Sequence, residues 1–108
     1  MDLTPSERIT PGSRSYVYLL HAAEVGLYKI GHSKNPRARA MALECGGPIP
    51  LRLVHQILTN DAVWLEMMLQ KQYAAKRVRG EWFRLEDADV SNIRSVRTYF
   101  GRQRSFYR

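Results

Sequence analysis

The sequence predicts one α+β domain in which strands and helices alternate along the chain. Two observations predict this class. Three short runs are rich in β-branched, aromatic and aliphatic residues, and helix-starting signals follow the second and the third run. The chain of 108 residues, 44% hydrophobic and 25% charged, is long enough for one domain with one core.

The first two runs predict an antiparallel hairpin. They cover residues 16–21 (YVYLLH) and 27–32 (LYKIGH), and Gly26 stands in the short connection between them. Gly31 lies inside the second run, where a glycine often marks the close approach of a ligand or another segment to the backbone. The nearby Lys29 is a less ordinary residue for a strand.

The next helix and the third strand are predicted from their ends. Asn35 suits a helix cap and Pro36 the first helical position, and the Gly-Gly-Pro sequence at 46–48 stops the helix. We therefore expect a helix over residues 36–44. Residues 51–58 (LRLVHQIL) then predict a third strand.

The second half of the chain predicts two further helices. Thr, Asn and Asp at 59–61 offer capping oxygens for a helix over residues 62–76, which Gly80 ends. Residues 81–85 (EWFRL) predict a short extended piece. Residues 87–100 carry a weaker helical pattern, which predicts an extra C-terminal helix.

The predicted domain covers residues 15–100. Residues 1–14 contain two prolines and a glycine without apolar periodicity, which predicts a flexible arm, and residues 101–108 form a basic tail. We find no signal peptide and no apolar run of membrane-spanning length. Cys45 is the single cysteine, so no internal disulfide or cysteine metal cage can form. These features predict a cytoplasmic protein with no membrane partner.

Charge indicates the class of partner. Seventeen Lys and Arg against ten Asp and Glu leave a net charge of +7. Such an excess in a small domain favours a polyanion, because each neutralised phosphate releases condensed counterions. A nucleic acid is the favoured partner, although a membrane surface or ribosomal RNA would also attract a net positive charge of this size.

Glu66 is difficult to explain by folding alone. At about 100° per residue it shares a helix face with Ala62, Leu69 and Tyr73, which is the core-facing side of the predicted helix. An unpaired carboxylate there is costly unless a metal ion or a buried arginine compensates it. The alternative is that Glu66 lies at the edge of the apolar stripe and reaches water.

The segment after Gly31 offers candidates for binding phosphate and moving protons. Arg37 and Arg39 begin the first helix, where a guanidinium could clamp a phosphate or stabilise transition-state charge; the alternative is a solvated helix face. Lys34 is a further candidate for nucleic-acid binding. His32 could assist proton transfer, or be a solvated turn residue.

Several of these residues form an ordered set along the chain. Its members are the triplets Tyr16-Val17-Tyr18 and Lys29-Ile30-Gly31, separated by ten residues, then Arg39, Glu66 and the closing Gly80-Glu81-Trp82-Phe83. In this order, residues 16–85 resemble the GIY-YIG nuclease domain, in the branch found in phage and stand-alone bacterial proteins. The resemblance implies the cytoplasm of a bacterial or phage-infected cell.

The resemblance also implies a fold and a mechanism. The fold is a small three-stranded antiparallel sheet flanked by helices, and the activity is that of a DNA endonuclease that hydrolyses phosphodiester bonds with a single metal ion. Tyr18 would act as general base or position the attacking water. Glu66 would hold one Mg²⁺ or Mn²⁺, which keeps most of its water, and Arg39 would neutralise the non-bridging oxygens. The candidate catalytic set is completed by Lys29, Tyr16 and His32.

Three positions depart from the family's pattern. Lys29 replaces the tyrosine of the second triplet; it could bind phosphate or lower the pKa of Tyr18, but it cannot serve as a phenol acceptor while protonated. Gln70 stands where branch members often carry histidine, which weakens the case for a proton relay or second metal ligand there. Many family members carry an asparagine late in the domain, and here Glu81 lies near that position. We interpret Glu81 as a structural carboxylate rather than as catalytic support.

Two other functions stay open. A non-catalytic nucleic-acid-binding module could keep the fold and its basic face, and a basic adaptor could bind a protein through Trp64, Trp82 or the tail. The DNA could be single-stranded, duplex or branched, and a homodimer or a protein partner could supply specificity. The tail could follow a phosphate backbone or serve only solubility. Its candidate binding residues are Arg102, Arg104 and Arg108.

Overall fold

The structure, a computed structural model, describes residues 14–101. The predicted arm and tail lie outside this range except for Arg14 and Gly101, and so do the candidates Arg102, Arg104 and Arg108. The elements are β1 (Ser15–Ala22), β2 (Leu27–Ser33), α2 (Pro36–Cys45), β3 (Arg52–Thr59), α3 (Ala62–Gln72), the 3-10 helix η1 (Ala74–Lys76), β4 (Arg77–Arg79), β5 (Trp82–Phe83), α4 (Asp87–Arg94) and β6 (Thr98–Tyr99).

One mixed sheet organises the domain, with its strands in the order β4-β5-β2-β1-β3-β6. The long strands β2, β1 and β3 form an antiparallel centre, in which Tyr18 pairs with Gly31 on one side and with Gln56 on the other. The predicted α+β class, the hairpin and the third strand are confirmed.

The predicted three-stranded sheet is wrong in its extent, because the sheet has six strands within the described residues. β5 pairs with β2, β4 pairs with β5, and β6 pairs in parallel with β3. These three added strands are only two or three residues long. A run this short shows no period-two pattern, so sequence periodicity does not detect it.

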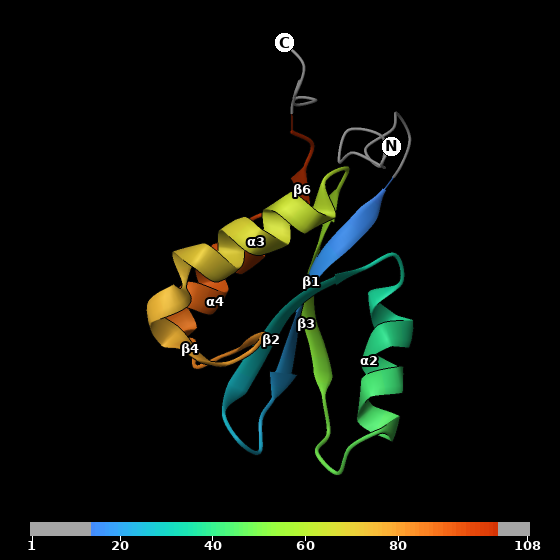
Figure 1. Cartoon of the computed structure of the whole chain (residues 1–108), viewed down its shortest axis with the longest axis vertical. Helices are drawn as coiled ribbons and strands as arrows, with labels where there is room; N and C mark the ends of the chain where they lie inside the picture. Colours follow the sequence, from blue (N-terminus) through green and yellow to red (C-terminus); the bar gives the residue numbers. More distant parts are fainter. Residues whose placement is uncertain (1–13, 102–108) are drawn as a thin grey trace.

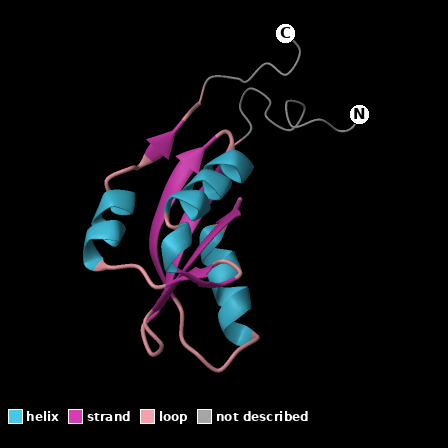
Figure 2. Cartoon of the chain, turned by 60° about the vertical axis from the view of Figure 1, so that its left-hand side comes forward, coloured by secondary structure: helices cyan, strands magenta, loops and turns pink. Residues whose placement is uncertain are grey.

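The C-terminal helix is also shorter than predicted. α4 ends at Arg94 instead of residue 100, and the chain then extends into β6. Three of the four residues in 96–99 are β-branched or aromatic, and such residues favour extended backbone. Tyr99 stacks on Trp64 of α3, with ring centroids 5.6 Å apart. Figure 2 shows β6 lying beside the end of β3.

The ends of the other helices follow local signals. The side chain of Asn35 caps α2 by accepting a hydrogen bond from Ala38 N at 3.1 Å, and Pro36 occupies the first turn. α3 ends at Gln72 rather than at residue 76, since the last residues of the predicted helix tighten into η1. None of the helices in residues 14–101 is long and apolar enough to span a membrane.

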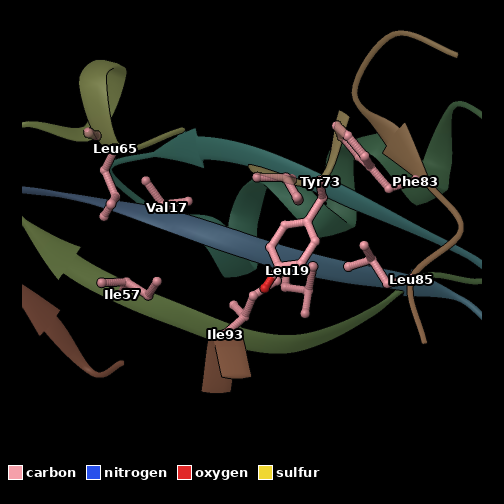
Figure 3. Close-up of a cluster of buried hydrophobic side chains, with 10 residues drawn as sticks. Val17, Leu19, Ile57, Leu65, Tyr73, Phe83, Leu85 and Ile93 are labelled. Atoms are coloured by element: carbon pink, nitrogen blue, oxygen red, sulfur yellow. The ribbon is translucent and has the colours of Figure 1, made fainter. Parts of the chain in front are cut away.

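Two apolar clusters pack on the two faces of the sheet. α2 lies on one side of the strands, and α3 with α4 on the other (Figure 1). The larger cluster, shown in Figure 3, contains Leu19 of β1, Phe83 of β5 and Ile93 of α4. The smaller cluster contains Tyr18 of β1 and Ala40 of α2. Tyr18 therefore faces α2, on the opposite side of the sheet from α3.

A polar contact ties α4 to the end of α3. Lys76 in η1 donates a hydrogen bond to Asp89 Oδ2 at 2.5 Å, and Asp89 also accepts one from Glu86 N at 2.8 Å within a capping box. The bond from Lys76 and then the bond from the Glu86 amide lower the pKa of Asp89. The bond to Asp89 raises the pKa of Lys76.

Candidate active site

Glu66 lies in the second turn of α3, and its side chain is only 13% exposed. Its two oxygens have different partners. Oε1 accepts a hydrogen bond from Nδ1 of His32 in β2, and Oε2 accepts one from Nε2 of Gln70 at 2.9 Å. The carboxylate is therefore largely buried, as its position on the helix predicts. A histidine and a glutamine compensate it, rather than a buried arginine.

Gln70 joins the helix to the sheet. Its Nε2 also donates to Ile30 O of β2 at 2.9 Å. A glutamine amide nitrogen carries two hydrogens, and both have acceptors here. Because the acceptors are Glu66 and the backbone of a buried strand residue, Gln70 holds the carboxylate in a defined place relative to β2.

Lys29 and Glu81 form an ion pair at the edge of β2. Their side chains are 13% and 43% exposed, so the lysine is mostly enclosed and the carboxylate is not. Lys29 pairs with Trp82 in the β2–β5 ladder, and Ile30 N donates to Glu81 O at 3.0 Å. The short strand β5 therefore brings together two charges that stand 52 residues apart in the sequence.

Glu81 also connects this ion pair to Glu66. Burial favours the neutral form of Glu81, but the hydrogen bond and the charge of Lys29 outweigh it, with further contributions from Glu66 and His32. The net effect lowers the pKa of Glu81 below its ordinary value of 4.5. Five side chains thus form one polar cluster, which we call the Glu66 cluster: Lys29, His32, Glu66, Gln70 and Glu81.

Tyr18 lies next to this cluster through its strand partner Gly31. A Cβ atom placed on Gly31 would lie 2.5 Å from the Tyr18 hydroxyl oxygen and 2.6 Å from its Cζ, so only glycine fits under the ring. The segment that approaches Gly31 is thus the Tyr18 side chain, which is 2% exposed. Gly31 stands between Ile30 and His32, both of which take part in contacts of the Glu66 cluster.

The other candidates lie apart from the Glu66 cluster. Arg39 is exposed on α2, and its guanidinium makes no ion pair within residues 14–101. Lys34 is exposed in the connection between β2 and α2. Tyr16 and Arg37 line a cleft on the α2 side of the sheet, together with Arg97.

Two features of the site escaped the sequence interpretation. The bond from Gln70 to Glu66 is one of them, although a spacing of four residues places the two side chains side by side on a helix. That spacing is a usable signal. The pairing of Lys29 with Glu81 has no local signal, because it depends on a two-residue strand that periodicity does not reveal.

Comparison with known protein families matches residues 15–97 to the T5orf172 domain. The chain belongs to the T5orf172 domain family. This family is associated with nuclease-like domains. No curated protein and no solved structure matches the chain. The matched region includes all five residues of the Glu66 cluster.

The donor set of this T5orf172 domain fits a magnesium-type ion better than a zinc-type ion. Within the described residues, no three His, Cys, Asp or Glu side chains form a group that could hold a metal. Magnesium needs no such cage, since it is commonly held by one or two carboxylates and keeps several waters. A carboxylate has about four acceptor positions, so the two hydrogen bonds to Glu66 leave room for one such ion.

Proposed function

We propose that this T5orf172 domain is a metal-dependent DNA endonuclease of the GIY-YIG type, which hydrolyses phosphodiester bonds at the Glu66 cluster. The observation that carries the proposal is the carboxylate of Glu66, which is 13% exposed and is held by His32 and Gln70 beside the Lys29–Glu81 pair. A protein that only bound nucleic acid would have no need of an oriented and largely buried carboxylate.

His32 is suited to moving a proton. Its Nδ1 donates to Glu66, so in the neutral ring Nε2 is the nitrogen that can accept a proton. The ring is fixed by this bond, while 42% of the side chain remains exposed to solvent. We assign His32 the role of taking a proton at Nε2 from the attacking water, in the way a carboxylate orients a catalytic histidine.

The two cations and Tyr18 have separate roles in the proposal. The Lys29 ammonium is held in place by Glu81 and would bind a phosphate oxygen, and the exposed Arg39 would neutralise a non-bridging oxygen. The hydroxyl of Tyr18 lies over Gly31, the neighbour of His32 in β2, and from there it would position the attacking water, while exposed groups bind the DNA.

Glu66 would hold one Mg²⁺ or Mn²⁺, with Glu81 as a second carboxylate within reach. When bound, this ion supplies the positive charge that neutralises the leaving oxygen. The lowered pKa of Glu81 favours its charged form, which is the form that binds cations.

The test is a cleavage assay with Glu66→Gln. The wild-type chain is given labelled single-stranded, duplex and branched DNA with Mg²⁺, Mn²⁺ or EDTA. We expect cleavage that requires the metal and disappears in Glu66→Gln, while Glu24→Gln, an exposed glutamate in the β1–β2 turn, cleaves normally. Circular dichroism and DNA affinity check that Glu66→Gln still folds and binds. Unfolding of Glu66→Gln would mean that Glu66 is a structural partner, and the metal assignment would fail.

A non-catalytic nucleic-acid-binding module is the second candidate. It is favoured by the fact that both oxygens of Glu66 already have protein partners, as they would in a purely structural network. DNA binding without cleavage under every metal condition would establish it in place of the nuclease.

A further inference from the structure

A cleft of about 500 Å³ opens on the side of the sheet that carries α2. Strand β3 lines it along residues 53–56, the start of α2 contributes Arg37, and the segment before β6 contributes Arg97. Tyr16 lines the cleft from β1, two residues before Tyr18, and residues two apart in a strand point to the same face. The cleft therefore lies on the Tyr18 side of the sheet, and Tyr16 pairs in the β1–β2 ladder with Ser33, the neighbour of His32.

The cleft carries positive charge without compensation. None of its described lining residues is acidic, and within residues 14–101 neither Arg37 nor Arg97 forms an ion pair. Both side chains are exposed at the rim. Two guanidinium groups across one hollow are suited to binding phosphate groups, because each offers several donors in a fixed plane.

The backbone at Arg97 is held in place on both sides. His55 Nε2 donates to Val96 O at 2.6 Å, and Leu58 N donates to Arg97 O at 3.1 Å. Both donors belong to β3, which also lines the cleft. The backbone of Arg97 is thus held by β3, so the side chain starts from a defined place beside the cleft.

We propose that this cleft, the Arg37–Arg97 cleft, binds the nucleic-acid substrate on the Tyr18 side of the sheet, outside the Glu66 cluster. Arg37 and Arg97 each bind a backbone phosphate, and the ring of Tyr16 stacks on a base. The inference rests on the proposed nucleic-acid substrate and assigns a second contact region to it. It also gives Tyr16 a role in substrate binding in place of the catalytic role that the resemblance implied.

The test measures binding of labelled single-stranded and duplex oligonucleotides by fluorescence anisotropy, in EDTA and over a range of salt concentrations. The double variant Arg37→Gln with Arg97→Gln is expected to bind tenfold or more weakly. The slope of log K against log salt should fall by about 1.4 to 1.8, since each lost phosphate contact removes about 0.7 for a single strand and about 0.9 for a duplex.

Two matched comparisons separate the cleft from general charge. Arg84→Gln removes an exposed arginine that follows β5, near the opposite edge of the sheet, and should change affinity less than twofold. Tyr16→Phe keeps a stacking ring and should bind normally, while Tyr16→Leu should lose about tenfold. Equal losses in Arg84→Gln and the double variant would overturn the proposal, as would wild-type binding by the double variant.

A labelled poly-glutamate peptide tests the other class of polyanion. Binding of the peptide through Arg37 and Arg97, with oligonucleotide binding unaffected by their loss, would assign the cleft to an acidic protein and overturn the proposal. The outcome is independent of cleavage. If the double variant binds DNA normally, the cleft assignment fails while metal-dependent cleavage can still stand. If the arginines are needed for binding but the wild-type chain cleaves no DNA, the nuclease proposal fails and the cleft assignment stands.

Discussion

Gln70 donates a hydrogen bond to Glu66, one helical turn before it in α3, at 2.9 Å, and shares the same amide nitrogen with Ile30 O of β2. A single neutral side chain therefore connects the candidate catalytic carboxylate to the backbone of the sheet. This tether carries no titratable group, because the side chain that provides it is a neutral amide.

Gln70→Ala tests whether this tether positions Glu66 for catalysis. We expect kcat to fall by roughly 10- to 100-fold, the usual effect of losing a group that orients a metal-binding residue, with KM for DNA changed less than about twofold. The Mg²⁺ concentration needed for half-maximal cleavage should rise, because Glu66 loses its fixed orientation. The free energy of unfolding should fall by about 1–3 kcal/mol, since Ile30 O loses its side-chain donor.

Gln72→Ala is the matched control, because Gln72 is exposed in the same helix. It should leave kcat and the Mg²⁺ requirement unchanged. A purely structural role for Gln70 predicts a different result: lower stability with kcat and the Mg²⁺ requirement as in the wild type.

Lys29→Met tests the electrostatic state of Glu81. Lys29 is the main influence that lowers the pKa of Glu81 against the opposing effect of burial. Its removal should therefore raise the pKa of Glu81, as followed by the side-chain carboxyl carbon in an NMR titration. In the wild type the ion pair stabilises the fold above the ordinary pKa, and this contribution is lost as pH falls through the lowered one. The stability difference between wild type and Lys29→Met should thus shrink in acid.

Lys34→Met provides the comparison, since Lys34 is an exposed lysine five residues along the chain. Lys34→Met should leave the pKa of Glu81 unchanged. A Glu81 pKa that stays low in Lys29→Met would show that a group other than Lys29 stabilises the charged form of Glu81.

Gly31→Ala tests the packing of Tyr18 on the strand. The new methyl group would lie 2.5 Å from the Tyr18 hydroxyl, and the ring is buried, so the strand or the ring must move. We expect a loss of about 1–3 kcal/mol in the free energy of unfolding, as for other overpacked sites. Chemical denaturation measures it, with Gly47→Ala as a control at a site where the nearest atom is 3.8 Å away.

A double-mutant cycle attributes this loss to the ring. In a Tyr18→Ala background the ring is absent, so Gly31→Ala should cost much less than it does in the wild type. Equal costs in both backgrounds would show that the glycine is required for a reason other than Tyr18.

The long elements were predictable because each has a local pattern. The hairpin, the third strand and the start of α2 at Asn35 follow from apolar runs and from capping and turn residues. The short strands β4, β5 and β6 were not predictable, because they gain their stability from pairing with distant strands rather than from their own two or three residues.

The site shows the same division. The placement of Glu66 on a largely buried face follows from helical spacing, and its partner Gln70 could have been found from the same spacing. The approach of Glu81 to Lys29 depends on β5, so no local pattern predicts it. The Arg37–Arg97 cleft likewise depends on β6 replacing the predicted end of the last helix.

Asp89→Asn tests the contact that fastens α4. Asp89 caps the helix through Glu86 N and accepts a hydrogen bond from Lys76, and the bond from Lys76 is the main cause of its lowered pKa. Asparagine keeps the shape and an oxygen that can accept from Glu86 N but removes the charge, so stability at neutral pH should fall because Lys76 loses its charged acceptor. Urea denaturation at several pH values measures it, with the exposed Asp87→Asn in the same turn as control.

The pH dependence of that difference identifies its cause. A lowered pKa means that Asp89 stabilises the fold above its ordinary value of 3.8, and that this contribution is lost as pH falls through the lowered pKa. The raised pKa of Lys76 means that its contribution is present below 10.5 and is lost as pH rises through the raised value. The stability difference between wild type and Asp89→Asn should therefore be constant from about pH 5 to 9 and should narrow below pH 4. Equal stability of wild type and Asp89→Asn at neutral pH would mean that Asp89 acts through its shape alone, and the ion pair with Lys76 would then contribute nothing to holding α4.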